Sequence, residues 1–170
     1  MSIATREQEV TDAVEKRLFV GGEWRDPAGG ATLPVEDPST GETLCEVADG
    51  TEEDARAALD AAVAAQAEWG ASEPNTRSEV LWKAFELLNE RKADLALLMT
   101  LEMGKPVAES EAEITYAAEF FRWFSGEALR TRGDYRVSGN GAFRVITMRQ
   151  PVGPSLMITP WNFPMAMGTR

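Results

Sequence analysis

The chain contains no histidine, and its only cysteine is Cys45. Histidine is the commonest general base and metal ligand in proteins, so its absence removes both roles from this chain. One cysteine cannot form a disulfide bond within the chain. These absences exclude a Ser-His-Asp triad and a zinc site built from this chain alone, and we expect no metal centre.

Positive charge is scarce as well, with 17 lysine and arginine residues against 28 aspartate and glutamate residues and a net charge of −11. Proteins that bind nucleic acid need clustered lysine and arginine to neutralise phosphates. The acidic residues are spread over predicted helices, as on a solvated protein surface. We therefore expect no nucleic-acid partner.

Long apolar runs are also missing. No stretch approaches the ~20 apolar residues that a membrane span needs, and residues 1–16 lack the apolar core of a signal peptide. With 44% hydrophobic and 26% charged residues, the chain can still form a core and a wet surface. We expect a cytoplasmic protein without membrane contact, and its length alone predicts one domain.

What the sequence does contain begins with two β-hairpin patterns. Residues 18–24 (Leu-Phe-Val-Gly-Gly-Glu-Trp) predict two strands joined by a Gly-Gly turn, because both turn positions need positive φ. Residues 33–47 predict a second β segment around the turn at residues 38–41. Cys45 lies in this segment without a neighbouring base or positive charge to activate a thiolate, so we interpret it as structural.

Helical periodicity follows these hairpins. Thr51 starts a capping-box pattern that predicts a helix over residues 51–70. A second helical region runs over residues 74–104 with a break or bend near Asp94, and a third helix starts at Pro106. Their apolar stripes are more typical of a protein core than of a cofactor site.

A third hairpin pattern covers residues 134–137 and 143–150, which the turn-forming residues 138–141 separate. A two-stranded ribbon is only marginally stable alone, so this hairpin needs a partner surface. Either it folds back on the same domain or it pairs elsewhere, and the sequence pattern leaves both arrangements open.

The last segment combines a strand pattern with a rigid turn. Residues 155–158 (Ser-Leu-Met-Ile) form the short apolar run of a covered parallel strand. Pro160 and Pro164 follow it and prevent the backbone from continuing a ladder or entering a helix before residue 164. The carboxamide of Asn162 is thereby placed at the carboxyl end of a strand, where open α/β sheets bind their ligands. The alternative is an asparagine that bonds its own backbone within a turn.

Five stretches of the chain together resemble the aldehyde dehydrogenase superfamily. They are Gln-Pro-Val-Gly through Ile-Thr-Pro-Trp-Asn-Phe-Pro at residues 150–164, the hairpin at 18–24, Pro-Ser-Thr-Gly-Glu at 38–42, Leu-Glu-Met-Gly-Lys-Pro at 101–106 and Glu-Phe-Phe-Arg-Trp-Phe at 119–124. The resemblance covers nearly the whole chain after about residue 16 and is strongest to the succinate-semialdehyde dehydrogenases. In that family the polypeptide continues far beyond this length, so we expect an N-terminal portion.

The resemblance implies a fold of the α/β class, namely the N-terminal part of an aldehyde-dehydrogenase-type fold. Residues 1–133 would form the helical and β part of the cofactor-binding domain, and residues 134–150 the hairpin strands of an oligomerisation region. Residues 151–170 would supply the first strand and the helix start of a Rossmann-like core. A homo-oligomer is implied for the full-length enzyme. Because the first strand would leave an open, apolar sheet edge, we expect poor solubility or partial order for these residues alone.

The chemistry that the resemblance implies is aldehyde oxidation through a cysteine thioester. Such enzymes attack the aldehyde with a thiolate, transfer hydride to NAD or NADP, and hydrolyse the thioester with a glutamate-activated water. Asn162 occupies the family's position for the donor to the developing oxyanion. Four residues match positions that contact the cofactor, namely Ile158, Thr159, Pro160 and Trp161. Without the nucleophile and glutamate motifs, the chain alone is expected to be inactive.

Arg170 is the residue from which we predict the substrate. It follows Asn162 by eight residues, about two helical turns, so it can face the same cavity. In succinate-semialdehyde dehydrogenases the arginine at this position binds the distal carboxylate of the substrate, which implies oxidation of succinate semialdehyde to succinate. Two alternatives remain: another aldehyde substrate with Arg170 incidental on a helix surface, or a non-catalytic acidic interaction module. The choice between NAD and NADP is open.

Overall fold

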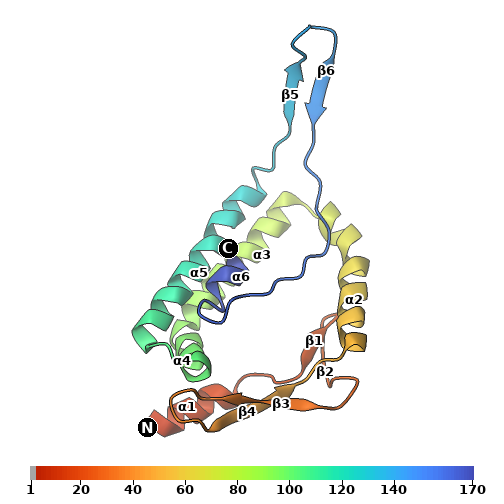
Figure 1. Cartoon of the computed structure of the whole chain (residues 1–170). Helices are drawn as coiled ribbons and strands as arrows, with labels where there is room; N and C mark the ends of the chain where they lie inside the picture. Colours follow the sequence, from red (N-terminus) through yellow and green to blue (C-terminus); the bar gives the residue numbers. More distant parts are fainter. Residues whose placement is uncertain (1–2) are drawn as a thin grey trace.

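Six helices and six strands make up the computed structural model, which describes residues 3–170. In chain order they are α1 (Ile3–Asp12), β1 (Leu18–Val20), β2 (Glu23–Arg25), β3 (Thr32–Glu36), β4 (Thr43–Ala48), α2 (Glu52–Ala71), α3 (Pro74–Glu90), α4 (Lys92–Met103), α5 (Val107–Ala128), β5 (Asp134–Val137), β6 (Arg144–Thr147) and α6 (Ala166–Thr169). Figure 1 shows β1–β4 on one side of the helices and β5–β6 projecting from the opposite end.

The strands of the described residues pair as three antiparallel hairpins, β1 with β2, β3 with β4 and β5 with β6. Gly21 and Gly22 have φ values of 63° and 90°, so the predicted Gly-Gly turn is confirmed. Cys45 lies opposite Val35 in the β3–β4 pair and is partly buried. The second arm of the last hairpin is shorter than predicted, because pairing ends at Thr147.

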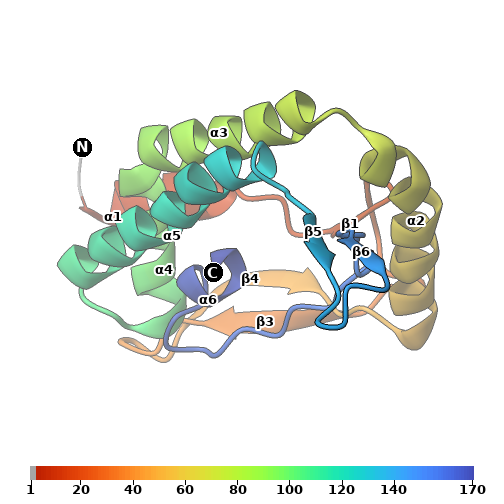
Figure 2. The same ribbon diagram turned by 90° about the horizontal axis from the view of Figure 1, so that it is seen from above.

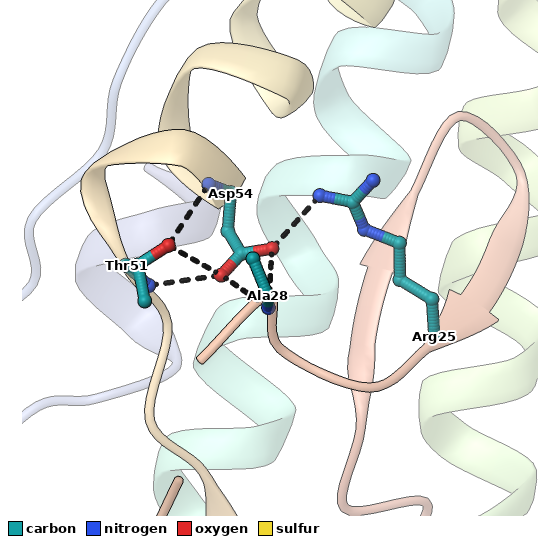
Figure 3. A network of polar contacts seen from close by, with 4 residues as sticks. All are labelled: Arg25, Ala28, Thr51 and Asp54. Carbon is teal, nitrogen blue, oxygen red and sulfur yellow. Dashed lines mark hydrogen bonds and ion pairs between the residues drawn. The ribbon is translucent and has the colours of Figure 1, made fainter. Parts of the chain in front are cut away.

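A buried carboxylate joins the first hairpin to the start of α2 (Figure 3). Thr51 and Asp54 form the predicted capping box, in which the Asp54 carboxylate accepts from the Thr51 backbone N–H at 2.9 Å. The same carboxylate accepts from the Ala28 backbone N–H and pairs with Arg25 at 2.9 Å. The Thr51 backbone N–H is the main reason that the pKa of Asp54 lies below its ordinary value. Asp54 therefore fixes the loop after β2 as well as the helix end.

The remaining helix boundaries follow local sequence with one shift. The helix predicted to start at Pro74 is confirmed, and α4 ends at Gly104, whose φ of 77° is the left-handed conformation typical of a C-cap. The expected break near Asp94 occurs at Arg91 instead, and Asp94 lies in the first turn of α4. An acidic residue is favourable there because it faces the positive end of the helix dipole.

The core of the described residues is small and centres on α4 and α5. Ala96, Met99 and Ile114 are buried, and three partly buried side chains pack against them: Leu95, Met103 and Met165. Met165 immediately precedes α6, so this cluster brings the end of the chain against α5, and both views show the two helices side by side (Figures 1 and 2). Helix α5 is therefore the rigid support of the last segment.

The predicted strand over residues 155–158 does not form. Residues 151–160 run as an irregular, exposed segment, with Leu156 and Ile158 exposed to 87% and 88%. A strand exists only where a neighbouring strand accepts and donates its backbone hydrogen bonds, and in the described residues each strand pairs within its own hairpin. The apolar composition of this segment cannot replace that partner.

Candidate functional site

Asn162 lies in a turn of residues 161–165 that connects the exposed segment to α6. The turn is closed by the Phe163 backbone N–H, which donates to the Pro160 carbonyl at 3.3 Å. Asn162 is exposed, and within the described part of the chain its carboxamide makes no hydrogen bond. The alternative of an asparagine that bonds its own backbone is therefore absent from this structure, and the amide donor is available to a ligand.

Lys105, which lies two residues after the end of α4, contacts the backbone of this turn. Its ammonium group donates to the Asn162 carbonyl oxygen at 2.7 Å and lies 4.5 Å from the centre of the Phe163 ring. It also forms an ion pair with Glu113 of α5. The Lys105 side chain is only 9% exposed, because these three partners surround it.

Glu113 holds the other end of the turn. One carboxylate oxygen accepts from the backbone N–H groups of Met165 and Ala166, each at 3.1 Å, and the other oxygen pairs with Lys105. These two N–H groups lie at the start of α6, where intrahelical acceptors are lacking. Glu113 is 3% exposed. One buried carboxylate of α5 thus joins Lys105, in the loop after α4, to Met165 and Ala166 at the start of α6.

Neither Lys105 nor Glu113 was among the predicted site residues. A signal was present in α5. Glu113 falls on the same helical face as Ser110, Ile114 and Ala117, all of which are fully buried. A carboxylate on a buried face needs a partner, since an isolated buried charge is strongly unfavourable. Helical periodicity could therefore have marked Glu113, although not its partners.

The four residues matched to cofactor contacts, Ile158, Thr159, Pro160 and Trp161, are consecutive and exposed. The Trp161 side chain is 77% exposed. Apolar side chains next to backbone groups outside any ladder suit a flat ligand with polar edges, such as a nicotinamide nucleotide. The role of these four residues in cofactor binding stays a prediction.

Arg170 caps the carboxyl end of α6, and its backbone N–H donates to the Ala166 carbonyl at 3.1 Å. Its exposed side chain lies one short helix beyond the Asn162 turn. The predicted helix starting at Pro164 instead begins at Ala166 and is only four residues long. The structure thus places Asn162 in the turn before α6 and Arg170 at the carboxyl end of that helix.

A separate cavity of about 880 Å³ lies between α2, the start of α3 and the segments that flank the base of the β5–β6 hairpin. Its lining includes Trp69, Arg77, Arg132 and Arg149, and none of the predicted site residues. No group of histidine, cysteine, aspartate and glutamate among the described residues could hold a metal ion. Over the same residues, no helix is long and apolar enough to cross a membrane.

Comparison with known sequences gives close relatives. The chain is 53% identical over 127 residues to a succinate-semialdehyde dehydrogenase of Paenarthrobacter nicotinovorans, covering 75% of this chain and 28% of the relative. It is 44% identical over 154 residues to succinate-semialdehyde dehydrogenase [NADP(+)] 1 of Schizosaccharomyces pombe, covering 91% and 31%. The chain thus spans about a third of the length of these relatives.

Comparison with solved structures confirms the predicted fold class. An NADP-dependent enzyme from Escherichia coli matches with a TM-score of 0.88 and 40% identity, covering 94% of this chain and 33% of that one. A betaine aldehyde dehydrogenase from Staphylococcus aureus in complex with NAD+ matches with a TM-score of 0.91 and 29% identity, covering 97% and 33%. Residues 24–170 also match the sequence pattern shared by the aldehyde dehydrogenase family. The chain therefore belongs to the aldehyde dehydrogenase family.

Proposed function

We propose that the protein carrying this chain oxidises succinate semialdehyde to succinate with NAD or NADP. The chain would supply a donor to the oxyanion, part of the cofactor-binding surface and an arginine for the substrate carboxylate. The observation that carries the proposal is exposed Asn162, whose carboxamide has no hydrogen-bond partner in the described residues. Lys105 bonds its backbone carbonyl, and Glu113 bonds N–H groups at the other end of the turn. The similarity to succinate-semialdehyde dehydrogenases supports the substrate.

The proposed role of Asn162 follows from the charge that develops on the substrate. When a nucleophile attacks an aldehyde, the carbonyl oxygen becomes anionic, and a fixed hydrogen-bond donor stabilises that charge. A carboxamide N–H donates without a proton to lose. Cys45 is not proposed as the nucleophile, because it lies partly buried within β4. We propose that the nucleophilic cysteine and the glutamate base lie outside these residues and that this chain alone is inactive.

The cofactor would be held by residues 158–161. Bound NAD or NADP supplies the hydride acceptor for aldehyde oxidation. The exposed Ile158 and Trp161 side chains would cover apolar parts of the cofactor, and the backbone at Thr159 would remain available for polar contacts. The exposure of residues 151–158 also supports the proposal that further strands of a longer polypeptide cover this segment.

The projecting hairpin is the proposed oligomerisation surface of a homo-oligomer. It extends beyond the helices instead of folding back on them (Figure 1). Tyr135, Phe143 and Ile146 on it are exposed to 61%, 66% and 71%. Exposed apolar side chains in such a group are typical of a surface that a partner covers. A cytoplasmic location without nucleic-acid or membrane partners completes the proposal.

Arg170 distinguishes succinate semialdehyde from other aldehydes. In the full-length protein, we expect Arg170→Gln to lower kcat/KM for succinate semialdehyde by about 10- to 100-fold, because a hydrogen bond to a charged group contributes about 1.5–3 kcal/mol. Activity toward butanal, which has no carboxylate, should change little. Steady-state kinetics with both substrates measures the effect.

The matched control is Arg56→Gln, which removes an exposed arginine of α2. This variant should leave both activities unchanged. Equal kcat/KM values of the unmodified protein for succinate semialdehyde and butanal would favour the alternative, an aldehyde dehydrogenase with a different substrate and an incidental Arg170.

A further inference from the structure

We infer that the Lys105–Glu113 ion pair is a positioning pair that sets the placement of the Asn162 carboxamide. The inference rests on the proposed function, because it assigns the pair a role in the reaction that Asn162 would serve. Neither side chain is proposed to touch substrate or cofactor. Both act through the backbone of the turn at residues 161–165.

The burial of the pair requires an explanation beyond stability. The Glu113 and Lys105 side chains are 1% and 9% exposed, and moving both charges out of water costs free energy that the ion pair alone often fails to recover. Such a pair persists when additional hydrogen bonds satisfy the remaining donors and acceptors. Here those additional bonds all go to residues 162–166.

The contacts fix the turn at both of its ends. Lys105 binds the carbonyl oxygen of Asn162 itself, and Glu113 binds the N–H groups of Met165 and Ala166 three and four residues later. The residues before the turn offer no such support, because 151–160 are irregular and mostly exposed. The direction of the Asn162 side chain therefore depends on this pair.

The turn is positioned relative to α5, which carries more buried residues than any other helix among the described residues. Ile114 and Ala117, which flank Glu113 on its face of the helix, are both 0% exposed. A donor in an active site is effective only within a narrow geometry, and a displacement of about 1 Å can reduce the rate by about 10²-fold. A carboxylate on a rigid helix can hold the turn to that accuracy.

Hydrogen exchange tests the contact independently of catalysis. In the full-length protein, Glu113→Ala should increase exchange of the amides in a peptide covering residues 161–168 by at least about 10-fold, since protection is lost when the acceptor disappears. Glu113→Gln keeps an oxygen for the same two N–H groups and should preserve most of the protection. Glu109→Gln, an exposed residue of the same helix, is the matched control and should match the unmodified protein. Unchanged exchange in Glu113→Ala would overturn the inference.

Kinetics tests the consequence for the reaction. Glu113→Ala should lower kcat by about 10²-fold with KM within a few-fold, and Glu113→Gln should restore kcat to within about 10-fold of the original. Lys105→Met keeps the apolar stem but removes the bond to Asn162, and it should lower kcat by at least about 10-fold. Rates are expressed per folded site, from circular dichroism and active-site titration.

The outcomes separate the two proposals. Unchanged kcat per folded site in Glu113→Ala and Lys105→Met would reduce the pair to a purely structural role and overturn the inference. Should Glu113→Ala not fold, Lys105→Met and Glu113→Gln decide the question with the same readouts. If the unmodified protein oxidises no aldehyde, the proposed function fails, whereas the exchange experiment still decides whether the pair positions the turn.

Discussion

At the scale of single residues, the proposed chemistry depends on one side-chain amide. Asn162→Ala in the full-length protein should lower kcat by about 10²- to 10³-fold, which is the usual effect of removing one oxyanion donor. KM should change little, because the donor acts mainly on charge that appears after substrate has bound. Steady-state kinetics with succinate semialdehyde measures both constants.

Asn75→Ala provides the control, because Asn75 is exposed in the first turn of α3. It should leave kcat and KM unchanged. A kcat for Asn162→Ala within a factor of about three of the original would remove the oxyanion role of Asn162, given the size of the expected loss.

At the scale of elements, the β5–β6 hairpin is sensitive at its base. A Cβ atom added at Gly133 would overlap the Thr147 carbonyl oxygen, which belongs to the backbone and cannot rotate away. Gly133→Ala should therefore displace the hairpin and destabilise it by about 1–3 kcal/mol, as overpacking does elsewhere. Faster exchange of the β5 and β6 amides, and dissociation of the proposed homo-oligomer in size-exclusion chromatography, would report the change.

Gly139→Ala tests the same hairpin without the overlap, since no atom lies within 4 Å of a Cβ added there. This variant should keep both the exchange rates and the oligomeric state. Similar behaviour of the two variants would mean that the close approach at Gly133 does not determine the position of the hairpin.

At the scale of the whole molecule, buried aspartates make stability depend on pH. The pKa values of Asp37 and Asp54 lie below the ordinary value of 3.8, mainly because of the Ser39 hydroxyl and the Thr51 backbone N–H, respectively. Because the folded pKa is lower than the unfolded one, the stabilisation is present above the ordinary value and is lost as pH falls through the folded pKa. Chemical denaturation between about pH 5 and about pH 2 should show this loss.

Asp54→Asn should flatten that pH dependence, because the variant no longer titrates at this position. Asp60→Asn, which changes an exposed residue of α2, should retain the original slope. Identical slopes for the two variants would show that Asp54 does not contribute to the acid sensitivity of the fold.

Much of the secondary structure could be predicted because it depends on neighbouring residues. The capping box at Thr51, the turn at Gly21 and Gly22 and the C-cap at Gly104 each satisfy a backbone requirement within a few positions. The position of the proposed oxyanion donor could be predicted from the motif around Asn162. Its role stays a prediction until the variants above are measured.

The sequence by itself determined the local elements and the family of this protein, because caps, turns and motifs lie within short stretches of chain. Only the tertiary structure decided that residues 155–158 remain unpaired and that Glu113 and Lys105 hold the Asn162 turn. The hydrogen bonds of Glu113 and Lys105 to this turn join residues that are 52, 53 and 57 positions apart in the sequence. The physical reason is that a strand needs a partner and a buried charge needs a counter-charge, and both depend on which distant segments the fold brings together.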